Sequence, residues 1–558
     1  MSLRHLQKFK NVIFSGKVRH ASHLSVTLKH NGKVEGEKLR GEILANEYLS
    51  WKGIPYGKPP VEELRFKAPV PHSGWIGSQK ATKHGNVCIQ KLPSNPSKVV
   101  GDEDCLFLNV YTPTKREGPL PVMVWVHGGA FSFGSGDADY FSPELLVNED
   151  VIVVTFNYRL GVLGFLGTED KHSQGNYGLK DIAMACEWVK DNIGAFGGDS
   201  EKITLFGESG GAMMIHSLLL SPMNRGLFQK AILQSGTSAL SSCFLQPKPL
   251  ERASELARYL NIKYKTTEQL VHELKRTDAV ILAQNVPSWI NREIPNGKLP
   301  LAFSPCIEPE DSLEPRILPE SPTNLLRKNV HPDIPMIVGV NSAEGLYAVS
   351  EWQNNACLFG ILNDEPEHLL PNNWNVDPNS AVAKEILNDI YRVYFNNEPI
   401  RNVTDYVKYV SDSQWNYGPY SSVCHHLEHQ KSPIYFYVFS FSGDLSINKI
   451  KKKLKDYEGV IHGDDVPYLF PMARFAPKMT QDNPAFVTRA RMVKMWANFA
   501  KHENPTPSTD SLLNVNWSKV EKNSFNYLDI GEKLEVKVDP FEGRLKIWQK
   551  MDEKFQKS

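Results

Sequence analysis

The chain has 558 residues, of which 41% are hydrophobic and 23% are charged, and its 63 basic residues balance its 63 acidic residues. That balance favours neither nucleic acid nor an anionic membrane surface as a partner, so we expect no nucleic-acid partner. No apolar stretch approaches the ~20 residues of a membrane span. Length alone suggests several domains, yet no long linker, repeat or low-complexity tract marks a boundary.

Residues 1–24 form a basic extension without an acidic residue. It lacks the continuous apolar run of a secretory signal. Three interpretations stay open: a disordered extension, an amphipathic helix in peripheral contact with a membrane, and a mitochondrial transit peptide. We expect an intracellular protein, cytoplasmic or peripherally membrane-associated, with its folded domain in residues 25–558.

Residues 121–131 read PVMVWVHGGAF, an apolar strand that breaks directly into small residues. This pattern is typical of the HGGG-type oxyanion loop, with alanine in the third small position. Small residues let the backbone turn sharply and present neighbouring N–H groups to a developing negative charge. The segment therefore predicts an oxyanion hole.

Two further segments indicate the fold class. Residues 151–156, VIVVTF, lack polar alternation and predict a strand covered on both faces. Residues 180–192 place apolar side chains at helical spacing and predict an amphipathic crossover helix. Strands that alternate with helices imply a mostly parallel central sheet with helices on both faces, with catalytic loops at the carboxyl ends of its strands.

Residues 201–214, EKITLFGESGGAMM, contain a G-x-S-x-G pentapeptide between a β-rich run and a helix-forming run. In that context the pattern predicts a nucleophile elbow with Ser209 at its tip. A serine hydroxyl is a weak nucleophile at neutral pH, so it needs a neighbouring base.

Together these segments resemble the type B carboxylesterase and cholinesterase family of α/β-hydrolases, and among its members the insect carboxylesterases most. The resemblance runs from about residue 26 to about residue 548. Its further motifs are GIPYGKPP at 53–60, EDCLFLNVY at 103–111, NYRLG at 157–161 and GNYGLKD at 175–181. The resemblance implies one α/β-hydrolase domain in spite of the length.

The resemblance also implies the partners of Ser209, in the chain order serine, acid, histidine. The matching acid is Glu344, in the segment VGVNSAEG that ends an apolar run. The matching base is His462, in the segment GVIHGDD. His462 would take the serine proton, and Glu344 would hold the imidazole tautomer.

The remaining site residues surround this triad. The expected oxyanion donors are the N–H groups of Gly129, Ala130 and Gly210, although family members commonly carry alanine where this chain has Gly210. Glu208 and Ser235 resemble residues that form hydrogen bonds around the triad.

Cys88 and Cys105 match the positions of a disulfide that the family shares, and the odd count of seven cysteines leaves at least one free thiol. Two aspartates follow His462 closely, but no second histidine stands there at ligand spacing. We therefore expect neither a metal nor a cofactor.

The substrate class follows from two differences from relatives. Cholinesterases place a tryptophan between the two cysteines, where its ring attracts a quaternary ammonium, and this chain has none. Juvenile hormone esterases typically carry glutamine where this chain has Glu208. We expect neutral, apolar esters as substrates, with clearance of xenobiotic, odorant or hormone esters as the setting and organophosphates as inhibitors.

Two alternatives stay open. One is a sequestering esterase that is acylated quickly but releases its product slowly. The other is a non-catalytic, cholinesterase-like binding protein, because the family includes adhesion ectodomains that lack triad residues.

Overall fold

A computed structural model describes residues 24–556 except 31, 225, 240–243, 285–302, 356, 372–373, 375 and 473–482. The predicted basic extension of residues 1–24 therefore lies outside the described residues, apart from Leu24.

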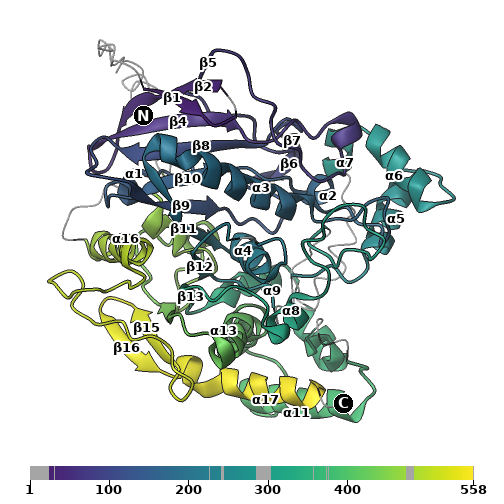
Figure 1. Cartoon of the computed structure of the whole chain (residues 1–558). Helices are drawn as coiled ribbons and strands as arrows, with labels where there is room; N and C mark the ends of the chain where they lie inside the picture. The colour runs from purple at the N-terminus through teal and green to yellow at the C-terminus, as the bar shows by residue number, and fades with distance from the viewer. Residues whose placement is uncertain are drawn as a thin grey trace, which may run out of the picture.

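An eleven-stranded sheet runs through the molecule (Figure 1). From β10 through β15 in the sheet order, neighbouring strands are parallel, and the strands beyond them pair antiparallel. The mostly parallel sheet predicted from the sequence is thus confirmed. In sheet order the strands are β16 (Leu534–Val538), β15 (Asn526–Ile530), β14 (Ile434–Phe439), β13 (Met336–Asn341), β12 (Lys230–Gln234), β11 (Gly198–Glu208), β9 (Leu120–Val126), β10 (Ile152–Phe156), β8 (Phe107–Pro113), β4 (Glu47–Pro55) and β3 (Glu37–Arg40).

Both faces of the large sheet are buried, because the side chains of each strand point alternately into one of two cores. In β10, Ile152, Val154 and Phe156 belong to one core and Val153 belongs to the other. All five residues of β10 are buried, as its uninterrupted apolar sequence predicts.

Helices cover each core from outside. The first core is covered by α3 (Tyr177–Asn192), α4 (Gly210–Leu220), α8 (Pro322–Lys328), α11 (Ala381–Tyr394), α13 (Tyr417–His429) and α17 (Arg544–Gln556). The second core is covered by α1 (Glu144–Val147), α15 (Val466–Leu469) and α16 (Pro484–His502). Figure 1 shows α17, at the C-terminal end, beside α11, and the two helices are in contact.

The remaining elements lie around this framework. The small sheets comprise β1 (Ser25–Leu28), β2 (Gly32–Glu35) and β5 (Ser78–Lys80), and β6 (Gln90–Leu92) with β7 (Asn95–Val100). The other helices are η1 (Glu62–Leu64), α2 (Gly161–Phe165), η2 (Ile193–Phe196), α5 (Pro249–Tyr259), α6 (Thr267–Arg276), α7 (Ala279–Gln284), η5 (Glu344–Leu346), α9 (Tyr347–Asn354), α10 (Leu358–Asp364), η6 (Pro366–Leu369), α12 (Val403–Ser411), η8 (Asp412–Asn416), α14 (Ile447–Lys451) and η9 (Pro540–Gly543).

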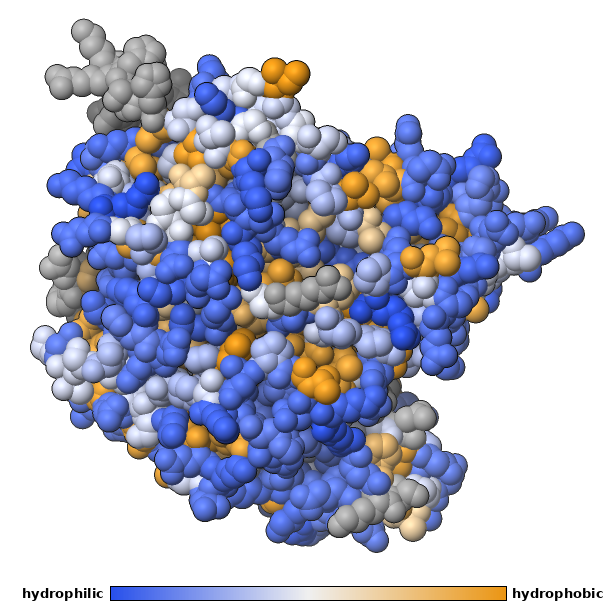
Figure 2. Space-filling view, in the orientation of Figure 1, coloured by the Kyte–Doolittle hydropathy of each residue, from blue (hydrophilic) through white to orange (hydrophobic). Residues whose placement is uncertain are grey.

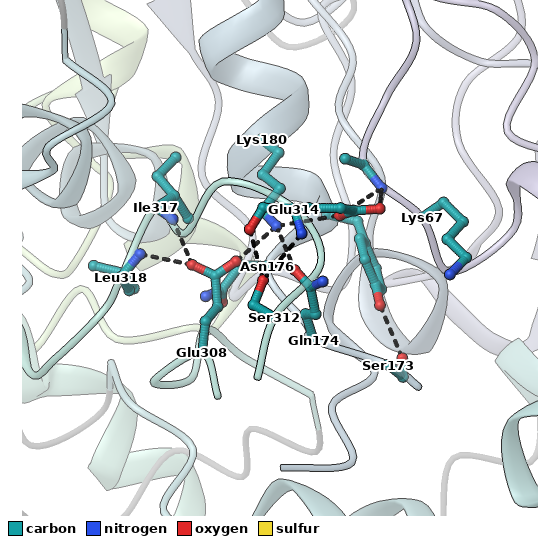
Figure 3. Close-up of polar contacts among 12 residues, drawn as sticks. Lys67, Ser173, Gln174, Asn176, Lys180, Glu308, Ser312, Glu314, Ile317 and Leu318 are labelled. Carbon is teal, nitrogen blue, oxygen red and sulfur yellow. Dashed lines mark hydrogen bonds and ion pairs between the residues drawn. The ribbon is translucent and has the colours of Figure 1, made fainter. Parts of the chain in front are cut away.

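The predicted crossover helix of residues 180–192 is α3, which begins three residues earlier at Tyr177. A buried ion pair fixes a later segment to its first turns (Figure 3). Lys180 Nζ lies 2.7 Å from Glu308 Oε1, and Glu308 Oε2 accepts hydrogen bonds from the backbone N–H groups of Ile317 and Leu318. The segment from 303 to 318 is thereby held against α3.

Polar and charged residues predominate on the face shown in Figure 2, and apolar residues form separate small groups there. This is the usual surface of a chain whose apolar side chains fill internal cores. No helix within the described ranges combines the length and the apolar composition that crossing a bilayer requires.

Candidate active site

Ser209 stands between β11, which ends at Glu208, and α4, which begins at Gly210. Its backbone has φ 56° and ψ −126°, a conformation that an L-residue adopts only when its surroundings enforce it. The Ser209 N–H donates to Gln234 O at 2.8 Å, and the Ser209 carbonyl accepts from Met213 N at 3.0 Å. The strand and the helix expected from the sequence therefore flank a sharp turn with the serine at its tip.

Glu344 and His462 meet although 118 residues separate them. His462 Nδ1 lies 2.7 Å from Glu344 Oε2. The Glu344 carboxylate is fully buried, and its Oε1 accepts from Ser235 Oγ at 2.6 Å and from Asn341 N at 2.6 Å. Three contacts therefore fix the carboxylate, and the expected contact with Ser235 is present.

The other nitrogen of His462 faces Glu208, whose Oε1 lies 3.2 Å from Nε2. Within the described part of the chain, Ser209 Oγ forms no hydrogen bond with His462. Contacts between nucleophile and base are often loose without substrate and tighten in the reacting complex. The structure thus brings Glu208 and Glu344 into contact with the two nitrogens of His462, and Ser209 follows Glu208 directly in the chain.

The pKa values of Glu208 and His462 are both raised, and for each group burial and the charge of the other group act in opposite directions. Burial raises the pKa of Glu208 to about 7, although His462 opposes that shift. Burial alone would lower the pKa of His462, but the charges of Glu208 and Glu344 and the hydrogen bond to Glu344 outweigh it and raise the pKa to about 9. The imidazole therefore holds a proton more tightly than a free histidine does.

A third carboxylate is buried close enough to this pair to act on it electrostatically. Asp465 is fully buried, and its Oδ2 accepts from Gln234 Nε2 at 2.8 Å and from the Tyr437 hydroxyl at 3.0 Å. Burial raises the pKa of Asp465, and its charge raises the pKa values of both Glu208 and His462. Sequence reasoning weighed this residue only as a metal ligand, and no group of three or more His, Cys, Asp or Glu side chains suited to a metal occurs among the described residues.

The predicted oxyanion loop leaves β9 at Val126 and passes close to the serine. A Cβ placed on Gly128 would lie 3.2 Å from Ser209 Cβ. Gly129 has φ +112°, and its carbonyl accepts from the N–H groups of Ser132 and Phe133 at 3.0 and 3.1 Å. The loop thus closes on itself beside Ser209.

The three N–H groups expected to be donors are available. Those of Gly129 and Ala130 donate to no acceptor in the described residues. Gly210 is the first residue of α4, where the N–H group has no acceptor within the helix. These groups could therefore all donate to a ligand atom beside Ser209.

His127 and Tyr158 fix the backbone that precedes Gly129. His127 Nδ1 lies 2.8 Å from Gly128 O, and because a carbonyl only accepts, Nδ1 carries the proton. The imidazole stacks on the Tyr158 ring with centroids 4.3 Å apart, and the Tyr158 hydroxyl donates to His127 O at 2.6 Å. Burial lowers the pKa of His127 to about 4, so the ring is neutral.

The far end of the loop is held from the disulfide segment. Cys88 and Cys105 form the disulfide that the family resemblance implied. Gln90 Oε1 accepts from Gly134 N at 2.8 Å, and Gln90 Nε2 donates to Gly134 O and to Cys88 O, each at 2.9 Å. Sequence reasoning missed Gln90, since a lone glutamine after a cysteine carries no distinctive pattern.

The glycine at position 210 has a packing partner. A Cβ at Gly210 would lie 3.1 Å from Cε1 of Phe131, which is tighter than ordinary contact. The Phe131 ring is buried and packs edge to face on Phe165 and Phe244. The aromatic ring therefore takes the space that an alanine methyl at this position would need.

Comparison with known proteins assigns the chain to a family. The model of the carboxylesterase family matches residues 22–548. The chain is 36% identical over 497 residues to juvenile hormone esterase of Tribolium castaneum, covering 85% of this chain and 82% of that protein. It is 33% identical over 524 residues to esterase E4 of Myzus persicae, covering 90% of each.

Solved structures agree with this assignment. The crystal structure of juvenile hormone esterase from Manduca sexta, with OTFP covalently attached, superposes with a TM-score of 0.83 at 30% identity and covers 95% of this chain and 99% of that one. A PNB esterase superposes with a TM-score of 0.74 at 28% identity, covering 95% of this chain and 100% of that one. The chain therefore belongs to the carboxylesterase family and is a carboxylic-ester hydrolase with the α/β-hydrolase fold.

Proposed function

We propose that this protein is a serine carboxylesterase that hydrolyses neutral, apolar esters through Ser209, His462 and Glu344 and an acyl-enzyme intermediate. The observation that carries the proposal is the 2.7 Å contact between His462 Nδ1 and a fully buried Glu344, in the family's chain order after a serine at a strained turn. A buried carboxylate that orients an imidazole supports the histidine–acid half of a catalytic triad, and the chain order supports Ser209 as its third member.

In the first half-reaction, Ser209 Oγ attacks the ester carbonyl carbon while its proton passes to His462 Nε2. The tetrahedral intermediate then collapses, the bond to the alcohol oxygen breaks, and His462 returns the proton to that oxygen. In the second half-reaction a water molecule gives a proton to His462 and attacks the acyl carbon, so that the carboxylic acid leaves and Ser209 regains its proton. Glu344 keeps the Nδ1 proton in place and stabilises the imidazolium.

The N–H groups of Gly129, Ala130 and Gly210 would stabilise the negative oxygen of each tetrahedral intermediate. Removing one donor of this kind typically lowers kcat by about 10²- to 10³-fold. Their lack of acceptors among the described residues supports this role, because a donor already engaged elsewhere would have to break that bond first.

Electrostatics support a neutral substrate. Glu208, Glu344 and Asp465 lie near the imidazole, all buried or nearly so. An ester that carries a negative charge would be repelled by these carboxylates. The carboxylate product would be repelled in the same way once it forms. The aromatic contacts of Phe131 add an apolar surface beside the expected oxyanion donors. Clearance of xenobiotic, odorant or hormone esters is the setting we propose.

A slow-turnover, sequestering esterase is the second candidate, and one observation favours it. Glu208 lies within ion-pair distance of Nε2, and the pKa of His462 is raised. A tightly held proton lowers the fraction of His462 that can act as base in both half-reactions, and deacylation, which releases the product, is slowed with them. Such an enzyme would bind ester carbonyls and phosphorus inhibitors covalently and release them slowly.

Stopped-flow kinetics with a neutral p-nitrophenyl ester separates the candidates. A serine carboxylesterase gives sustained release of p-nitrophenol, and a sequestering esterase gives a burst of one equivalent followed by a slow phase. The Ser209→Ala variant should lose both the burst and the turnover. Release by that variant at the wild-type rate would refute the proposal, and absence of any release by the wild-type protein would indicate a binding protein.

A further inference from the structure

The indole ring of Trp415 lies on the face of the His462 imidazole. The ring centroids are 3.8 Å apart and the planes are inclined by 32°. Trp415 is buried, with 3% of its surface exposed. Since Glu344 and Glu208 contact the two ring nitrogens, the indole supplies a third contact, on the π face.

A π-helical turn presents Trp415. Between α12 and α13 the chain forms η8, Asp412–Asn416, with the π-helical hydrogen-bonding pattern. Such a turn holds one residue more than an α-helical turn, changes the direction of the side chains that follow, and is frequent at functional sites. Trp415 therefore points in a direction that an uninterrupted helix through α12 and α13 would not give it.

The start of this turn is anchored by a buried carboxylate. Asp412 is fully buried, and its Oδ2 accepts from the Tyr394 hydroxyl at 2.7 Å and from Arg544 Nε at 2.6 Å. Its Oδ1 accepts from Asn416 Nδ2 at 2.8 Å, which closes the turn across its own ends. The position of Trp415 is thus fixed by α11 and α17 as well as by its own segment.

The same segment contacts the turn that carries Glu344. The N–H of Gly345, the residue after Glu344, donates to Ser411 Oγ at 2.9 Å. The polar edge of the indole is also fixed, because Trp415 Nε1 donates to the Tyr347 hydroxyl at 3.2 Å. The backbone beside Glu344 and the ring beneath His462 are therefore held by one unit.

We propose that Trp415 is a positioning residue for His462: the indole holds the imidazole against Glu344 in the orientation from which it would serve Ser209, and stabilises its protonated form. The inference rests on the proposed role of His462 as the base. The face of an indole carries partial negative charge and attracts a cation placed over it, which favours the imidazolium that forms in each proton transfer.

Three carboxylates also act on the same imidazole. Glu208 and Glu344 contact its nitrogens, and the charge of Asp465 also raises its pKa. Any pH dependence of His462 contains all three charges, so the contribution of Trp415 has to be measured as a difference between variants that keep these carboxylates.

The test compares Trp415→Leu with Trp415→Phe in the full-length protein. Trp415→Leu removes the aromatic face and should lower kcat for a neutral p-nitrophenyl ester about tenfold with little change in KM, and it should move the acid limb of the kcat/KM profile to lower pH. Trp415→Phe keeps an aromatic face and should retain most of kcat. Trp188→Leu is the control, because Trp188 is also buried in a helix and packs against Phe196 in another part of the fold. A Trp415→Leu variant with the wild-type kcat and acid limb would overturn the proposal.

Tryptophan fluorescence gives a second measurement that needs no catalysis. A protonated imidazole in contact with an indole quenches its emission, so the difference in emission between the wild type and Trp415→Phe should titrate with the pH of the acid limb. The difference in emission between the Ser209→Ala variant and the Ser209→Ala, Trp415→Phe double variant should titrate in the same pH range. If the difference in emission does not change with pH, the stacking role of Trp415 is overturned. If the difference titrates but the Ser209→Ala variant is active, only the proposed function is overturned.

Discussion

The carboxylate of Glu208 lies 3.2 Å from His462 through its Oε1 and the histidine Nε2, on the side of the imidazole opposite Glu344. The residue that precedes Ser209 in the chain thereby faces the nitrogen that exchanges protons with the serine in the proposed mechanism. The protonation of His462, and with it the rate of the reaction, should depend on this neighbour.

Glu208→Gln should move the acid limb of the kcat/KM profile to lower pH. As the proposed base, His462 can accept a proton only when neutral, and Glu208 is one of the charges that raise its pKa to about 9. Removing that charge lowers the pKa, so activity should appear at a lower pH, with a shift of about one unit. Glu201→Gln, at an exposed position of β11, is the control. Superimposable profiles for Glu208→Gln and the wild type would show that this contact does not set the limb.

Tyr158→Phe should lower kcat about 10- to 100-fold with a small effect on KM. The variant removes the hydroxyl that holds the His127 carbonyl and leaves the stacked ring in place, so the expected N–H donor of Gly129 loses its alignment. Tyr56→Phe is a matched control, because the buried Tyr56 hydroxyl also donates to a backbone carbonyl, that of Asn157. Equal losses of kcat in the two variants would argue for a general packing effect instead.

Gln90→Ala should weaken inhibition by a trifluoromethyl ketone more than it weakens binding of a non-reacting ester analogue. The ketone adduct places a negative oxygen in the oxyanion hole, whereas the analogue does not. Gln90 holds Gly134 through two hydrogen bonds, and its loss frees that end of the loop. Gln430→Ala, which also removes an amide that donates to a backbone carbonyl, should leave both affinities unchanged. A parallel loss of both affinities in Gln90→Ala would count against the clamp.

Lys180→Met should destabilise the protein by about 3–5 kcal/mol, because it leaves the buried Glu308 carboxylate without its cation. Calorimetry would show this as a lower Tm. The control is Lys202→Met, which breaks an exposed pair with Asp199 and should change the stability by less than about 1 kcal/mol. A Tm for Lys180→Met equal to that of the control would contradict the anchoring role of this ion pair.

Local patterns predicted the parts of the site that are continuous in sequence. The turn at Ser209 and the loop after Val126 each combine an apolar strand with small residues, and both occur where they were expected. The choice of Glu344, His462 and the Cys88 disulfide came from the family resemblance, because a lone carboxylate, imidazole or thiol carries no pattern of its own. The structure shows the contacts of Glu344 and His462 and the disulfide.

The rest of the site depends on contacts between distant segments. Trp415 reaches His462 through a π-helical turn, which hydrophobic periodicity does not reveal. The reference pKa of histidine, about 6.5, does not include the charges of Glu208 and Asp465. These charges raise the pKa of His462 in the folded protein. Similarly, apolar runs predicted buried strands such as β10, but the order of the eleven strands and the antiparallel edges are set by pairing across the whole chain.

The most direct test of the central claim is to locate the covalent adduct that an organophosphate forms with the protein. The reagent phosphorylates the activated nucleophile, so peptide mass spectrometry of the inhibited wild type should find one modified residue, Ser209, in proportion to lost esterase activity. The Ser209→Ala variant should carry no adduct. Loss of activity with the adduct on any other residue would contradict Ser209 as the nucleophile.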